Sequence, residues 1–152
     1  MARPHKIAPA GAIDEHALIL RAARDLDRAF AGATSGQMSA VRQRLLQQTR
    51  SVGDSLRKHC ASMEQPGGTL AEVEVVIGRV YQLTEARSEH ELLLDLADGL
   101  LAAIEQVADP SAPLAADVPA RCMWLTNTVR AHCVNETDLL QIRFTFDVGV
   151  VD

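Results

Sequence analysis

Aromatic residues and cysteine pairs are scarce in this sequence. Phe, Trp and Tyr make up 3% of the 152 residues, whereas Ala, Leu, Glu, Arg and Gln are frequent, a composition that favours helices over sheet. The three cysteines are an odd number and none lies in a Cys-x-x-Cys pair, which argues against a disulfide framework and a structural zinc site. Free thiols fit a reducing compartment, so we expect a cytoplasmic protein.

Long apolar runs and a strong net charge are also lacking. Residues 1–11 have no apolar block like that of a secretory signal, and no stretch is apolar over the length of a membrane span. The formal net charge of −5 is mild and mixed in sign, which offers neither a basic footprint for nucleic acid nor an attraction to membrane surfaces. We expect one domain with a sizeable core, no nucleic acid and no membrane as partners, and leave a homodimer open.

Apolar residues recur at helical spacing in four parts of the chain. The expected helices cover about residues 11–31, 37–64, 69–104 and 117–140. Thr69-x-x-Glu72 has the form of a capping box, so it opens the third helix. That helix is long, and a break near 86–88 stays open because Arg87 interrupts its apolar face.

The connections and chain ends complete the predicted fold. Short loops imply antiparallel neighbours, so the sequence predicts an all-α, up-down-up-down four-helix bundle over residues 11–140. Residues 1–10 form a loose leader. In residues 141–152 the apolar positions alternate instead, which predicts an extended C-terminal tail.

Each predicted helix carries one histidine on its apolar face. They are His16, His59, His90 and His132. The distance from His90 to the end of its helix is roughly 17 residues, or about 26 Å. The distance from the start of the last helix to His132 is roughly 15 residues, or about 23 Å. Because these distances agree, the histidines lie at about the same height along the bundle. Four imidazoles can therefore converge in one layer, which is how helical bundles build metal sites.

The two halves of the chain repeat the surroundings of these histidines. Glu15-His16 corresponds to Glu89-His90, and Arg57-x-His59-Cys60 to Arg130-x-His132-Cys133, at nearly equal separations. Such a correspondence indicates a diverged internal duplication, and therefore a pseudo-twofold bundle.

A metal ion buried among neutral imidazoles also needs a carboxylate to balance its charge. Glu136 follows His132 by four residues and lies on the same helix face. The equivalent position in the second helix is Met63, a poor ligand for hard iron. Glu64 comes next, turned by about 140° from the histidine, so it needs a π-bulge or a frayed helix end to swing inward.

This order of residues resembles the hemerythrin-like, or HHE cation-binding, family over about 16–140. The resemblance implies a bundle that holds two non-haem Fe ions, bridged by oxide or hydroxide and by carboxylates. By position, it makes the four histidines terminal ligands and Glu136 and Glu64 the bridges. It also implies that a small diatomic ligand, O2 or NO, or peroxide binds there, in sensing, redox chemistry or iron handling.

Two positions depart from the family, and other classes of function stay open. Leu94 stands where oxygen-carrying hemerythrins have a further histidine, and Met63 displaces a bridging glutamate. The chain therefore resembles four-histidine variants, in which water or another carboxylate, such as Glu89 or Glu85, takes the open positions. The alternatives are a metal-free helical-bundle interaction module and a diiron enzyme that decomposes peroxide. A ferritin-like oxidase is disfavoured, since the sequence has no Glu-x-x-His pair.

Overall fold

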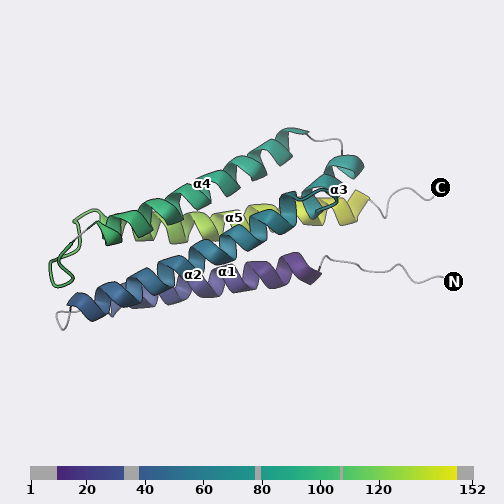
Figure 1. Ribbon diagram of the computed structural model, residues 1–152. Coiled ribbons are helices and arrows are strands. Elements are labelled where there is room, and N and C mark those ends of the chain that lie inside the picture. The colour runs from purple at the N-terminus through teal and green to yellow at the C-terminus, as the bar shows by residue number, and fades with distance from the viewer. Residues whose placement is uncertain (1–9, 33–37, 78–79, 107, 147–152) are drawn as a thin grey trace, which may run out of the picture.

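The computed structural model describes residues 10–32, 38–77, 80–106 and 108–146, and within them every regular element is a helix (Figure 1). The helices are α1 (Ala10–Ala31), α2 (Met38–Glu64), α3 (Thr69–Ile77), α4 (Val80–Glu105) and α5 (Val118–Phe146). The predicted all-α class is confirmed for these residues. No described helix is both long and apolar enough to cross a membrane.

Four long helices pack together in an up-down-up-down arrangement. Helix α1 contacts α2 and α5, and α4 contacts the same two neighbours. In Figure 1 the colour runs in opposite directions along each contacting pair, so neighbouring helices are antiparallel. The short helix α3 packs on one end of this bundle, where it contacts α2, α4 and α5.

A glycine turn connects α2 to α3 and fixes the end of α2. Gly67 has a φ of +78°, in the left-handed region that glycine adopts without strain. A Cβ added to Gly68 would lie 2.7 Å from the carbonyl oxygens of Ser62 and Met63. The last turn of α2, which carries Met63 and Glu64, is therefore held against the loop that follows it.

Two details differ from the sequence prediction. Helix α4 is continuous through 86–88, and the predicted third helix corresponds to two described helices, α3 up to Ile77 and α4 from Val80. Arg87 does not interrupt the core, because its side chain lies outside and pairs with Glu74 of α3 at 3.7 Å.

The prediction of an extended C-terminal tail is wrong for residues 141–146, because α5 continues to Phe146. Extending an existing helix adds one backbone hydrogen bond per residue, which outweighs a short alternating pattern. Residues 147–152 lie outside the described residues, and so do residues 1–9 of the predicted leader.

The apolar core consists of two clusters, one on either side of the histidine layer. The larger cluster includes Ile19, Leu56, Leu93 and Val129. The smaller one, at the α3 end, is Met63, Leu70, Val73, Leu83, Ala86, Leu139 and Leu140. The polar layer thus lies between two apolar layers that keep bulk water from it along the bundle axis.

Candidate metal centre

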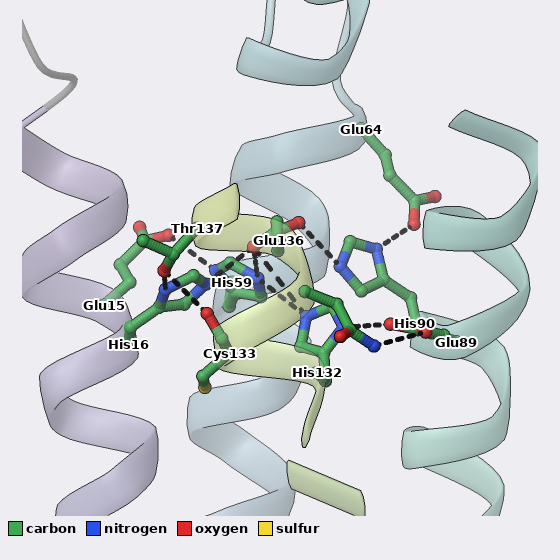
Figure 2. Close-up of polar contacts among 11 residues, drawn as sticks. Glu15, His16, His59, Glu64, Glu89, His90, His132, Cys133, Glu136 and Thr137 are labelled. Carbon is green, nitrogen blue, oxygen red and sulfur yellow. Dashed lines mark hydrogen bonds and ion pairs between the residues drawn. The ribbon is translucent and has the colours of Figure 1, made fainter. Parts of the chain in front are cut away.

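Four histidines, one from each long helix, meet around a single carboxylate (Figure 2). His16, His59, His90 and His132 come from α1, α2, α4 and α5, and the carboxylate is that of Glu136 on α5. All five residues are at most 6% exposed. The structure therefore brings together in one layer the four histidines that the sequence placed on one level.

The Nε2 atom of every imidazole faces this carboxylate. Its Oε2 atom lies 2.6 Å from Nε2 of His16, 2.9 Å from that of His59 and 3.8 Å from that of His132. Its Oε1 atom lies 3.3 Å from Nε2 of His90. One ligand atom from each of His16, His59, His132 and Glu136 falls within 4.8 Å of the others, close enough to hold one metal ion.

The Nδ1 atom of every imidazole faces outward and has its own oxygen partner. Three partners are carboxylates and one is a hydroxyl. The pairs are His59 with Glu15 at 3.2 Å, His90 with Glu64 at 2.5 Å, His132 with Glu89 at 2.9 Å, and His16 with Thr137 at 3.4 Å. A carboxylate at Nδ1 accepts a hydrogen bond there, which fixes the orientation of the ring and directs Nε2 at the centre.

The outer contacts follow the correspondence between the two halves of the sequence. Glu15, just before His16, contacts His59 of the neighbouring helix. Glu89, just before His90, contacts His132 in the same way. Figure 2 shows the two carboxylates on opposite sides of the cluster. The early Glu-His pair of each half thus provides one inward imidazole and one carboxylate that orients the next helix's imidazole.

Glu136 is an ionised carboxylate in spite of its burial. Burial alone would raise its pKa, but hydrogen bonds from His16 and His59 outweigh that effect and hold the pKa well below its ordinary value. The centre therefore contains a fixed negative charge that is 2% exposed. A buried charge of this kind requires a positive partner.

The imidazoles of α4 and α5 respond differently to this charge. Burial would lower the pKa of His90, but the Cys60 thiol and the surrounding carboxylates outweigh it and raise the pKa to about 10. For His132, burial outweighs the hydrogen bond to Glu89 and lowers the pKa. His132 therefore offers a neutral nitrogen, whereas His90 holds a proton that a metal ion would have to displace.

Two buried atoms in the middle of the cluster have no hydrogen-bond partner. They are Nε2 of His90 and Oε1 of Glu136. Nearly all buried polar atoms are paired in folded proteins, so both indicate a missing partner between them. A cation that accepts nitrogen and oxygen donors satisfies both atoms at once, and the residues present fit a metal ion.

Glu64 lies outside this inner group. Its Oε1 atom contacts the outward Nδ1 of His90, and its side chain is 36% exposed (Figure 2). The α-helix continues to Glu64, so no π-bulge turns it inward. Met63, one residue earlier, is fully buried in the smaller apolar cluster. Of the six residues expected as ligands, the structure brings five to the centre and places Glu64 in the outer ring.

The outer partners Glu15 and Thr137 were not expected from the sequence as parts of the centre, whereas Glu89 was one of the carboxylates considered for its open positions. The repeated Glu-His pair was the available signal for Glu15. No local sequence pattern indicated that Thr137 contacts the centre. Its hydroxyl donates to the carbonyl oxygen of Cys133 at 2.6 Å, which leaves its oxygen to face Nδ1 of His16.

The cysteines of the two halves have different surroundings. Cys133 packs in the larger apolar cluster, as a small hydrophobe should, and burial raises its pKa to about 12. Cys60 is also buried but lies beside His90, with which it hydrogen-bonds.

The fold and this centre define a helical-bundle protein with a buried histidine and carboxylate cluster that could hold a metal ion. No protein-family model, curated protein or solved structure matches the chain.

Proposed function

We propose that this chain is a hemerythrin-like protein that holds two non-haem iron ions and binds O2, NO or peroxide, in sensing, redox chemistry or iron handling. One observation carries the proposal. Three histidines, at 59, 90 and 132, have a carboxylate at Nδ1 and aim Nε2 at the ionised Glu136. A proton or a metal ion must lie between each Nε2 atom and the anion, and one metal ion can replace the protons of several imidazoles at once.

The charges of the cluster support two ions. The carboxylates that touch the four imidazoles are those of Glu15, Glu64, Glu89 and Glu136. Once metal has displaced the proton of His90 the four imidazoles are neutral, and two divalent ions balance the four negative charges. Glu136 offers its two oxygens to different sets of imidazoles, Oε2 to three and Oε1 to His90, which is the disposition of a bridging carboxylate.

The chain's own residues prepare the site for a small ligand. The imidazoles provide nitrogen ligands of the kind that suit iron, and the outer carboxylates fix their orientation. The apolar clusters above and below the layer exclude water, with Met63 on one side and Leu56 and Val129 on the other. When bound, iron supplies open coordination positions and redox chemistry for O2, NO or peroxide.

The deciding experiment is metal analysis together with the visible spectrum of protein expressed with added iron. We expect about two irons per chain in the wild type and loss of both iron and charge-transfer absorption in a His59→Ala, His132→Ala double variant. His5→Ala is the matched control, since His5 is the one histidine that does not belong to the four of the layer. Its iron content should equal that of the wild type. Absence of metal from a wild type with an intact helical spectrum would contradict the proposal and favour a metal-free interaction bundle.

A second measurement separates a sensor from an enzyme. The iron-loaded wild type and a His132→Ala variant are mixed with peroxide and with NO. Rapid loss of peroxide that disappears in the variant indicates an enzyme, whereas reversible NO or O2 binding without turnover indicates a carrier or sensor.

A further inference from the structure

An open hollow of about 250 Å³ lies between α4 and α5, directly over the buried carboxylate. Its lining is Glu85, Ala86, Glu89, Asn135, Glu136, Asp138 and Leu139. A second hollow of about 530 Å³ shares Glu85, Glu89 and Asn135 with the first. Because they share three residues, the two hollows form one cleft that leads from the surface to the centre.

The floor of the cleft is a buried carboxylate oxygen that accepts no hydrogen bond. Glu136 is 2% exposed and yet lines the hollow. Its Oε1 atom is the one without a hydrogen-bond partner. A buried carboxylate oxygen that accepts no hydrogen bond, at the inner end of an open cleft, points to a cationic occupant.

The walls have the same sign of charge as the floor. Of the described residues that line the two hollows, four are acidic and none is basic. Glu85 and Asp138 are exposed at the opening. Clefts lined by charge of one sign raise the local concentration of the opposite ion and speed its association.

Glu89 connects the opening to the inner ligands. One of its oxygens accepts a hydrogen bond from the Asn135 amide at 3.2 Å, and the other lies 2.9 Å from Nδ1 of His132. Its side chain is 35% exposed. A cation held by Glu89 at the wall is thus one side chain away from a ligand of the centre.

We propose that this acidic cleft is the route by which a divalent metal ion enters the centre. Glu85 and Asp138 collect the hydrated ion at the opening, Glu89 holds it at the wall, and Glu136 receives it at the floor. The inference rests on the proposed metal centre and adds its loading site. It concerns the rate at which metal arrives, since Glu85 and Asp138 do not touch the imidazoles that retain it.

The test measures the rate of metal uptake by metal-free protein. Co2+ is mixed with the protein in a stopped-flow instrument at low ionic strength, and its visible absorption reports coordination. In a Glu85→Gln, Asp138→Asn double variant we expect uptake about 10-fold slower than in the wild type. The final metal content should be unchanged, and added salt should remove most of the difference. Glu85→Lys, which reverses a charge at the opening, should slow uptake in the same direction.

The matched control removes the same number of charges at the other end of the bundle. Asp109 and Asp117 are exposed and belong to the connection between α4 and α5, and Figure 1 shows this connection at the opposite end of the bundle from α3. Asparagine at these positions keeps a side-chain oxygen for the hydrogen bonds from Ser111 and Arg121. An Asp109→Asn, Asp117→Asn variant should therefore fold and load at the wild-type rate.

Two outcomes would overturn the cleft as the route. One is an equal rate of uptake in the cleft variant and the wild type, and the other is equal slowing in the control variant. A wild type that takes up no Co2+ at all would overturn the metal centre itself, so failure of the route and failure of the centre give different results.

Discussion

Replacing Glu136 by glutamine tests whether the central carboxylate is a metal ligand. The substitution keeps the shape of the side chain and removes its charge. The carboxylate oxygens lie 2.6, 2.9, 3.3 and 3.8 Å from the four Nε2 atoms, and no other carboxylate faces these nitrogens among the described residues. The variant therefore removes the inner negative charge and leaves every imidazole in place.

The magnitude follows from linkage between metal binding and folding. At a free metal concentration about 1,000 times Kd, binding stabilises the folded wild type by about 4.1 kcal/mol. At about 2–4 °C per kcal/mol for a chain of this size, the melting temperature rises by about 8–16 °C. Removing partners of metal ligands costs 10- to 100-fold in affinity, so loss of an inner anionic ligand costs at least about 100-fold. The remaining stabilisation is about 1.4 kcal/mol, or about 3–6 °C.

The assay is thermal unfolding followed by circular dichroism, with and without Co2+, after removal of metal by a chelator. Glu91→Gln is the control, because Glu91 is exposed on α4 and the substitution is the same. Its metal-induced shift should match that of the wild type. If Glu136→Gln keeps the full shift, the carboxylate is not a ligand and the reasoning from its geometry is wrong.

Three further predictions concern packing, orientation and thiol access. Met63→Ala should destabilise the fold by about 2–5 kcal/mol in urea unfolding, since Met63 is fully buried, whereas Met123→Ala, at a side chain that is 61% exposed, should change it by less than about 0.5 kcal/mol. Glu89→Gln should weaken metal affinity by about 10- to 100-fold in a chelator competition, because His132 loses the charged acceptor at its Nδ1, and Glu89→Asp should recover part of it. The three cysteines are buried, so iodoacetamide should label them only after unfolding, and rapid labelling of native protein would contradict their placement.

The helices and the histidine layer could be predicted because both depend on short-range spacing. Apolar residues at a period of 3.6 identify a helix and its inner face, and His16, His59, His90 and His132 lie on that face. Glu136 was predictable for the same reason, being one turn after His132. Antiparallel packing of the four helices then places these histidines at the same height along the bundle, so their convergence could also be predicted.

The outer ring could not be derived in this way because each of its contacts crosses between helices. Glu64 shows most clearly why contacts between helices could not be predicted from the sequence. Its rotation of about 140° from His59 was known from helix geometry, but which group it would meet depended on the neighbouring α4. There it contacts the outward nitrogen of His90. The division of the third helix and the extension of α5 were likewise decided by packing and helix propagation rather than by local pattern.

The two halves of the centre differ at two pairs of corresponding positions, and the differences decide how evenly the centre can hold two ions. Four residues after its histidine, α5 presents Glu136 to the centre, whereas α2 presents Met63 to the apolar cluster. Five residues after, α5 has a hydroxyl and α2 a carboxylate, both at outward nitrogens. The second negative charge is thus displaced from the inside to the partly exposed outside.

An ion among His16, His59 and His132 has three nitrogens and Oε2 of Glu136 nearby, whereas an ion beside His90 has one nitrogen and Oε1. The first position must therefore bind more tightly than the second, because affinity rises with the number of ligands that are already in place.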